Sequence, residues 1–185
     1  MEKDYSYANG KLIGTLEGGV TIIIPKTGQT TKVRDGDDGD YEAGYAIGAS
    51  RYRDNGDGTV SELVSGLMWV KEPGAIGGVF GSAGNPAKMI WNDAIDNCEA
   101  LTYAGHSDWR LPNIFELCSL WKLDRRYPCI DIAYFPDCEG TFHWTSSLYP
   151  VGATNMMFVD FAYANTGAQV LGYSCHVRPV RGGLV

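Results

Sequence analysis

The apolar positions of this chain change their spacing several times, and the changes predict two short helices set between groups of short strands. From 90 to 104 apolar residues recur at helical spacing, and Gly105 supplies the left-handed stop of an amphipathic helix. Asn113 followed by Glu116 is typical of a capping box, so a second helix is expected to begin there. Asp-Gly and Asn-Gly pairs indicate tight turns between short elements.

Strands are expected on both sides of these helices. The glycine turn at 54–58 separates two short strands, residues 67–70 read as a core strand, and the glycine-rich stretch 72–88 reads as a loop. After the helices, short strands are predicted at 143–146, 157–161, 168–171 and 176–181. This order predicts an α+β fold.

The first 49 residues differ from the rest and are predicted to form an N-terminal arm used for oligomerisation or attachment, ahead of a domain at 50–185. The β-branched run 20–25 is too exposed to stand alone, so it is expected to pair with another subunit or to lie on the main domain. Residues 26–49 fit an ordered arm and a flexible linker about equally well.

Charge and length narrow the function classes. The formal net charge of -7 argues against nucleic-acid binding, which relies on clustered lysine and arginine. No apolar run approaches the roughly 20 residues needed to cross a bilayer, so membrane insertion is not expected. The start of the chain lacks the apolar core of a leader, so we expect either a removed leader or another way out, such as release within a virus particle.

Five cysteines are present, and none has the CxxC spacing of a zinc ribbon or a redox site. Cys129 and Cys138 flank a compact proline-containing loop and are the disulfide candidate in an oxidising compartment. Buried free thiols are the alternative.

Candidate metal and catalytic residues are sparse. Asp54 and Asp57 resemble the first half of a calcium loop, but Ser65 stands where the bidentate glutamate belongs, and a glycine turn explains the same residues. A second acidic cluster is equally ambiguous: Asp37, Asp38 and Asp40. The histidines, His106, His143 and His176, have no metal-binding spacing, and there is no GxSxG motif. We therefore expect no cofactor, with calcium as the weak alternative, and no enzymatic activity.

The stretch Asp108-Trp109-Arg110 between the two helices is interpreted as structural. A buried tryptophan contributes a large apolar area, and the flanking charges are expected to satisfy backbone groups or to pair with each other. Arg178 and Arg181 near the last strand are assigned similar structural roles.

Several separated motifs occur in one order: Arg51–Val60, Ser65-Gly66-Leu67-Met68-Trp69, Trp91 to Leu101, Gly105–Asn113, Trp144-Thr145-Ser146-Ser147 and Val177–Gly183. With these motifs the chain resembles the domain of unknown function 1566, also called the C-terminal domain of Legionella collagen-like adhesins. The resemblance implies a C-type-lectin-like fold, with two helices packed on small twisted antiparallel sheets. It also implies an extracellular trimeric adhesin or a phage tail receptor-binding protein.

Residues 147–176 are the expected ligand-binding region, because tyrosine and amide side chains on a rigid scaffold give adaptable contacts. The candidates are Tyr149, Asn155, Tyr163, Asn165, Gln169, Tyr173 and His176. The hypothesis is a homotrimeric recognition protein that binds a cell-surface glycan or protein, with other virion tail proteins as further partners. Two alternatives are a formylglycine-generating-like enzyme, in which Cys175 would be essential, and a structural virion component or retroelement-diversified protein.

Overall fold

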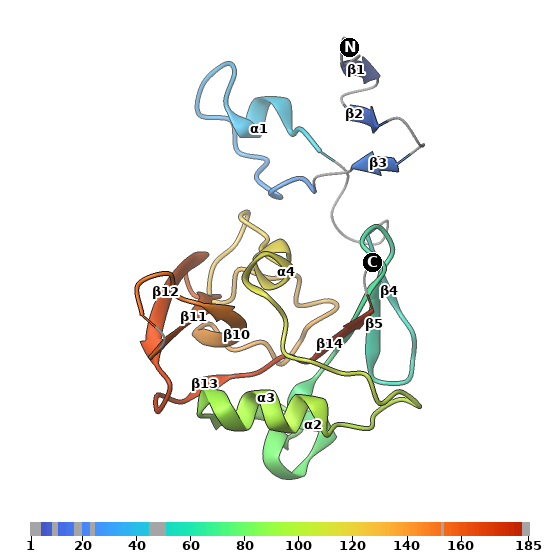
Figure 1. Ribbon diagram of the computed structural model, residues 1–185. Helices are drawn as coiled ribbons and strands as arrows, with labels where there is room; N and C mark the ends of the chain where they lie inside the picture. The colour runs from blue at the N-terminus through green and yellow to red at the C-terminus, as the bar shows by residue number, and fades with distance from the viewer. Residues whose placement is uncertain are drawn as a thin grey trace.

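The computed structural model describes residues 5–8, 11–16, 20–22, 25–44, 51–152 and 154–182. The expected boundary between arm and domain, at 49/50, lies outside these residues and stays a prediction, as does the arm-mediated trimer. In the described part the protein is α+β, with few helices and several small sheets (Figure 1).

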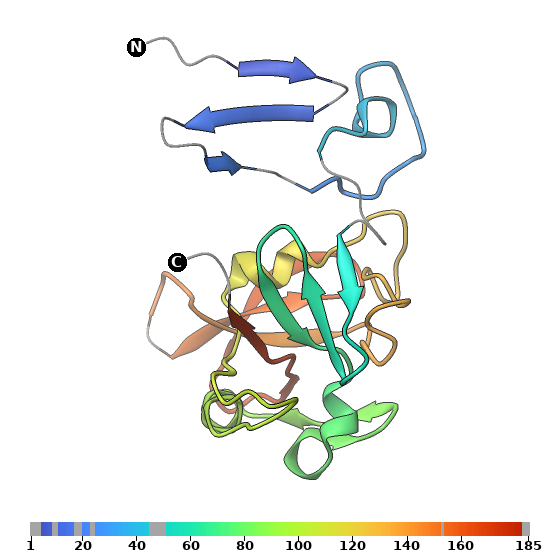
Figure 2. The ribbon, with the colours of Figure 1, turned by 90° about the vertical axis from the view of Figure 1, so that its right-hand side faces the viewer.

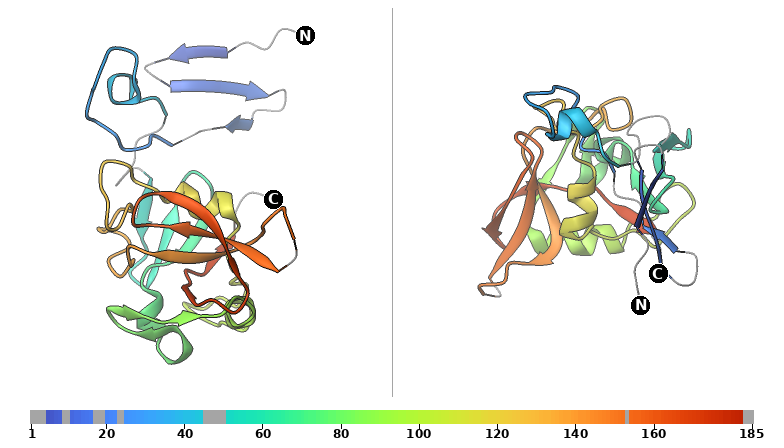
Figure 3. Two further views of the ribbon diagram at one scale, coloured as in Figure 1. Left: turned by 90° about the vertical axis from the view of Figure 1, so that its left-hand side faces the viewer. Right: turned by 90° about the horizontal axis from the view of Figure 1, so that it is seen from above.

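The largest sheet has five strands and is mixed. Its order is β12 (Asn165–Val170), β11 (Asn155–Asp160), β10 (Phe142–Leu148), β13 (Cys175–His176) and β9 (Lys88–Met89). β10 and β13 run parallel, and the other neighbours run antiparallel. The β10–β11 end carrying residues 148–152 projects from the domain (Figure 3).

A second, antiparallel sheet has the order β14 (Val180–Gly182), β6 (Leu67–Val70), β5 (Thr59–Glu62) and β4 (Tyr52–Asp54), and it faces the viewer in Figure 2. The glycine turn predicted between two strands is therefore confirmed as the β4–β5 connection. Asp54 accepts the Gly56 amide and pairs with Lys71, and Asp57 accepts from Thr59, so both candidate calcium ligands serve this turn.

Both predicted helices are present. α4 (Ile114–Ser119) begins at the expected capping box, in which Asn113 and Glu116 each accept the other's backbone N–H. α3 (Trp91–Glu99) ends five residues earlier than predicted. The chain leaves the helix at Ala100, because residues 103 and 106 exchange backbone hydrogen bonds and close a separate turn before Trp109.

The stretch predicted as a loop at 72–88 is more structured than expected. It contains short elements that follow its glycines and prolines: α2 (Pro73–Ile76), a 3-10 turn (Gly78–Phe80), β7 (Gly81–Ser82), β8 (Asn85–Pro86) and the first residue of β9. β7 and β8 pair as a small hairpin. A β-carbon at Gly74 would meet the Ser82 carbonyl oxygen at 2.2 Å, so Gly74 permits this close approach.

The arm forms a sheet of its own from β1 (Tyr5–Ala8), β2 (Lys11–Leu16) and β3 (Val20–Ile22). The run 20–25 is expected to pair with another subunit or to lie on the main domain, and in the structure β3 pairs with β2 of the arm. Pairing with another subunit stays a prediction. α1 (Asp38–Tyr41) follows, and the Asp37 side chain caps it, so this acidic cluster forms a helix start. The Leu123 amide reaches the Thr27 carbonyl oxygen at 2.7 Å and ties the arm to the domain.

Two apolar clusters form the core, and side chains that alternate between the two faces of a strand contribute to both. One contains Trp144 and Phe158, and the other contains Trp69 and Val159. Because neighbouring residues of a strand point to opposite faces, β11 sends Phe158 into the first cluster and Val159 into the second. β11 therefore contributes to both clusters, as does β6, which places Trp69 in the second cluster and Val70 in the first.

The motif at 108–110 is built into this core. Trp109 is buried and donates its Nε1–H to the Tyr103 carbonyl oxygen at 3.2 Å. Asp108 and Arg110 do not pair with each other in the structure. Asp108 pairs with Arg181 at 2.6 Å. Arg110 instead donates two hydrogen bonds, from Nη1 and Nη2, to the Glu116 carboxylate at 2.8 and 2.6 Å.

Candidate functional site

Two exposed tyrosines mark one end of the large sheet. The hydroxyl of Tyr127 donates to that of Tyr163 at 2.5 Å, and the rings meet edge to face with centroids 4.9 Å apart. Tyr127 is 57 % exposed and Tyr163 59 % exposed. The hydrogen bond to Tyr163 raises the pKa of Tyr127, so the Tyr127 hydroxyl stays protonated at physiological pH.

Local backbone bonds hold this pair in place. The amide of Tyr127 donates to the Ala162 carbonyl oxygen, and the amide of Cys129 donates to that of Phe161. The segment that carries Tyr127 is thereby fastened to the turn that carries Tyr163. Tyr127 itself has a left-handed backbone, with φ at 50°, which is uncommon for a residue other than glycine.

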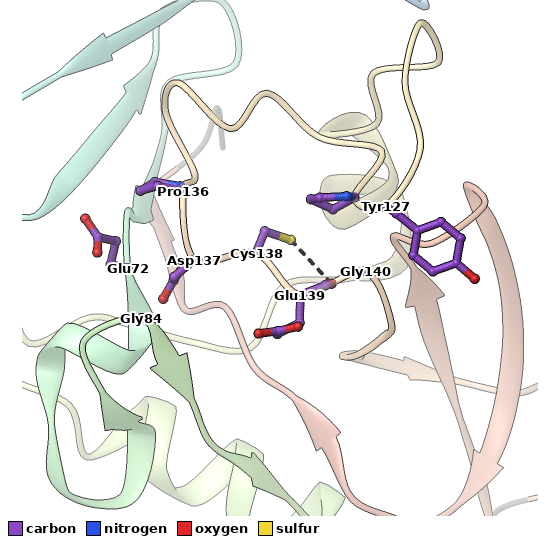
Figure 4. A pocket seen from close by; sticks show the side chains of 9 residues that line it. Glu72, Gly84, Tyr127, Pro136, Asp137, Cys138, Glu139 and Gly140 are labelled. Carbon is purple, nitrogen blue, oxygen red and sulfur yellow. Dashed lines mark hydrogen bonds between the residues drawn. The ribbon is translucent and has the colours of Figure 1, made fainter.

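A pocket of about 430 Å³ opens beside Tyr127, between the β7–β8 hairpin and the loop at 136–140 (Figure 4). Its lining combines aromatic, proline and acidic groups. The residues are Glu72, Gly84, Tyr127, Pro128, Pro136, Asp137, Cys138, Glu139 and Gly140. The volume falls in the range usual for small-ligand sites.

One acidic group of the pocket is structural. Asp137 is buried and accepts from Arg178 at 3.0 Å and from the Gly74 amide at 3.2 Å. Arg178, also buried, donates at 2.7 Å to the carbonyl oxygens of Val70 and Lys71. This network joins the pocket loop to α2 and to β6, so it holds the base of the pocket in place.

The other two acidic groups are available. Within the described residues, the carboxylates of Glu72 and Glu139 have no hydrogen-bond or salt-bridge partner. Glu139 is exposed and Glu72 is half-buried. Figure 4 shows the side chains of Asp137 and Glu139 leaving the loop on the same side. Two carboxylates with spare acceptor capacity beside an aromatic ring fit a ligand rich in O–H or N–H donors.

The thiol in the pocket wall is buried. Cys138 Sγ lies 3.9 Å from His143 Nε2 and 3.8 Å from the Glu139 carbonyl oxygen, and burial raises its pKa to about 11. His143 Nδ1 lies 3.1 Å from the Thr141 carbonyl oxygen, and burial holds the pKa of this imidazole well below its usual value. A nucleophilic cysteine needs a lowered pKa. Burial also raises the pKa of Cys175 to about 12.

All five cysteines are free, so the disulfide expected between Cys129 and Cys138 is not formed. Cys129 Sγ donates instead to the Ala162 carbonyl oxygen at 3.3 Å, while Cys138 faces His143. Among the described residues, no group of three or more His, Cys, Asp or Glu side chains is arranged to hold a metal ion.

The structure divides the predicted ligand-binding residues between two places. Tyr163 and Asn165 lie at the β11–β12 turn near the pocket, where Asn165 donates to Asp160 at 3.3 Å. Tyr149 and Asn155 lie at the opposite end of β11, joined by a backbone hydrogen bond of 3.1 Å.

The other three predicted ligand-binding residues lie at neither of these two places. Gln169 is half-buried opposite Met156, and Tyr173 lies beside Phe142, with ring centroids 6.4 Å apart. His176 is only 5 % exposed, so it is not at the binding surface, and burial lowers its pKa to about 4.

Sequence reasoning missed Tyr127, Glu72 and Glu139. The sequence marks the loop between Cys129 and Cys138 as a disulfide candidate, but its polar residues and the neighbouring Tyr-Pro pair also suit a recognition loop. Glu72 could not have been found, because its place depends on the fold of α2 against a loop more than sixty residues away.

The fold and the pocket define the class: a small mixed α+β domain with a recessed, aromatic and acidic surface site. A family model described as the Lcl C-terminal domain matches residues 58–181, about two thirds of the chain. The chain therefore belongs to the Lcl C-terminal domain family, in agreement with its resemblance to the C-terminal domain of Legionella collagen-like adhesins. A search of curated proteins gave no match. No helix in the described part of the chain has the length and apolar character needed to span a membrane.

Proposed function

We propose that this chain is a non-enzymatic recognition module of an extracellular, cell-surface adhesin, and that the pocket beside Tyr127 and Tyr163 binds a glycan. Membership of the Lcl C-terminal domain family supports the adhesin class. The pocket carries the proposal, because its lining includes Tyr127, one ring of the exposed aromatic pair, and two carboxylates without a described partner.

The chemistry of the pocket favours a sugar. An aromatic ring offers an apolar surface for the C–H face of a pyranose, and carboxylates accept hydrogen bonds from adjacent hydroxyl groups. The negative charges of Glu72 and Glu139 favour neutral or amino sugars over sulfated or sialylated ones. The raised pKa values of Cys138 and Cys175 speak against the alternative of thiol enzymology.

We also propose the finer fold assignment, C-type-lectin-like. α3 and α4 are short helices on small sheets, and one of the two segments that border the pocket, the loop at 136–140, comes from the second half of the domain. No observation favours attachment to a virion tail.

Binding of the full chain to a glycan array, followed by titration of the best sugar, tests the proposal. Tyr127→Ala and Glu139→Gln are each expected to weaken binding at least about tenfold, the effect of losing one good contact. Tyr149→Ala, at the opposite end of β11, is the matched control and should bind like the wild type. If Tyr149→Ala abolishes binding and Tyr127→Ala does not, the site lies at the hairpin end and the pocket proposal is wrong. A folded chain that binds no sugar also contradicts it.

A further inference from the structure

Two buried histidines adjoin the pocket loop at 136–140. His143 of β10 stands opposite His176 of β13 in the parallel register, and the ring centroids are 5.3 Å apart. His143 is 2 % exposed and His176 is 5 % exposed. His143 also faces Cys138, which lines the pocket. A change of charge on the His143 ring would therefore act directly on the pocket wall.

The hydrogen bonds of His143 suit a neutral ring. Nδ1 lies 3.1 Å from the Thr141 carbonyl oxygen, which only accepts, so Nδ1 carries the proton. Nε2 is then an acceptor, and it lies 3.9 Å from the Cys138 sulfur, whose S–H is a weak donor. A second proton, on Nε2, would point at this sulfur and not at a strong acceptor. The closed loop thus suits the imidazole and disfavours the imidazolium.

The charges around the two rings also oppose protonation. Burial has the largest effect in lowering the pKa of His143, and the charges of His176, Arg178 and Lys88 lower it further. The Asp137 carboxylate is already paired with Arg178. Among the described residues, no carboxylate forms an ion pair with either histidine. A proton gained by His143 would therefore be a buried charge without a counter-ion.

The segment that faces His143 lies between two fixed points. Before it, Asp137 is held by its buried ion pair. After it, the Thr141 carbonyl oxygen accepts the Phe161 amide at 3.1 Å. Residues 138–140, between these points, form one wall of the pocket. They can move away from the ring while both anchors stay in place.

We propose that protonation of His143 in mild acid releases residues 138–140 and opens the pocket, so that the chain holds its ligand at neutral pH and releases it in acid. The release of ligand rests on the proposed function, whereas the opening does not. In the open state water solvates the ring, and its pKa returns to the ordinary value of about 6.5. Since only the open state accepts the proton readily, opening is favoured as pH falls. A ring with this pKa is protonated about thirty to one at about pH 5, so the open population should rise by up to about thirtyfold.

Reaction of the thiols with dithiodipyridine, a disulfide reagent that stays active in mild acid, tests the opening without a ligand. The full chain is labelled at about pH 7.5 and about pH 5, on either side of the ordinary histidine pKa, and the labelled peptides are identified by mass. Each rate is divided by that of free cysteine at the same pH. We expect Cys138 to react about ten- to thirtyfold faster in acid, because its rate follows the open population.

Cys98 is the internal control, because it is fully buried in α3 and reports global unfolding. It should react more slowly than Cys138 at both pH values. A Cys138 rate that does not rise in acid, or equal rates for Cys138 and Cys98 in acid, overturns the proposal.

His143→Asn is the matched variant. Its side-chain amide can donate to the Thr141 carbonyl oxygen as Nδ1 does, but it takes up no proton in this range. The variant should lose the acid acceleration at Cys138, while His106→Asn, which changes the histidine beside Trp109, should keep it. Acceleration that survives in His143→Asn overturns the proposal. If this variant does not fold, the wild-type comparison of Cys138 with Cys98 decides alone.

The labelling needs no sugar, so its failure can be told apart from failure of the proposed function. A pocket that opens in acid but binds nothing on the glycan array contradicts only the glycan proposal. A pocket that binds a sugar, with Cys138 labelling that ignores pH, contradicts only the acid opening.

Discussion

At the scale of single residues, some acidic side chains are buried in ion pairs that hold the structure together, and others are exposed to solvent. Asp137 and Glu139 are two positions apart in one loop, yet only Asp137 is buried and paired with an arginine. Burial of such a pair adds little net stability, but loss of one partner leaves a charge in a low-dielectric site.

Replacing Asp137 with alanine should lower the free energy of unfolding by about 3–5 kcal/mol, because Arg178 loses its buried carboxylate. Urea denaturation measures the loss. Glu139→Gln, in the same loop, should leave the unfolding midpoint unchanged while weakening glycan binding. Equal losses from both variants would contradict the division of roles.

The buried histidines predict a pH dependence. Burial lowers the pKa of His143 and holds that of His176 at about 4, whereas an unfolded histidine titrates near pH 6.5. Below pH 6.5 the unfolded chain therefore binds protons that the folded chain does not, so stability should fall as pH drops from about 6.5 towards 4. Unfolding free energies measured across this range should show the slope, and His176→Asn should reduce it. An unchanged slope in that variant would rule out His176 as a source.

At the scale of elements, short strands depend on glycine where aromatic rings cross them. Phe158 lies opposite Gly167 in the β11–β12 pair and stacks on Phe142 with centroids 4.1 Å apart. A β-carbon at Gly167 would meet the Phe158 ring at 2.6 Å. The ring thus occupies the space that a side chain on β12 would need.

Gly167→Ala should therefore destabilise the domain by about 1–3 kcal/mol through overpacking against Phe158. Gly172→Ala is a close control, since a β-carbon there meets nothing within 4 Å. Thermal unfolding of the two variants compares them. A Gly167→Ala protein as stable as Gly172→Ala would show that the ring moves aside without cost.

Elements with strong local signals could be predicted from the sequence, and contacts between distant segments could not. The capping box at Asn113 and the glycine turn at 54–58 are local, so both were foreseen. The end of α3 was missed because the turn at 103–106 competes with the helix. The pocket joins Glu72 to the loop at 136–140, a pairing that only the packing of α2 creates. Tyr163 was foreseen as a surface tyrosine, but its partner Tyr127 was not.

At the scale of the whole molecule, the arm has a sheet of its own, in which the three arm strands pair with one another. Among the described residues, a backbone hydrogen bond from Leu123 to Thr27 joins the arm to the domain. Both core clusters are built from residues after position 50.

A chain beginning at residue 50 should therefore fold alone, with a melting temperature within a few degrees of the full chain, because one backbone hydrogen bond contributes only about 1 kcal/mol. Circular dichroism on heating measures this. Loss of cooperative unfolding in the shortened chain would show that the arm is part of the core. If the arm alone assembles trimers, the shortened chain should also lose that assembly.

The sharing of β11 by both core clusters has a consequence for how this domain can change over generations. Since Phe158 and Val159 anchor opposite sides of one backbone, the interior is fixed by inward-facing residues, and the exposed Tyr149 and Tyr163 belong to neither cluster. Substitutions at Tyr149, Tyr163 or the rim of the pocket leave that anchoring intact. Substitutions near the ends of β11 can therefore change ligand preference without requiring changes in the packed core.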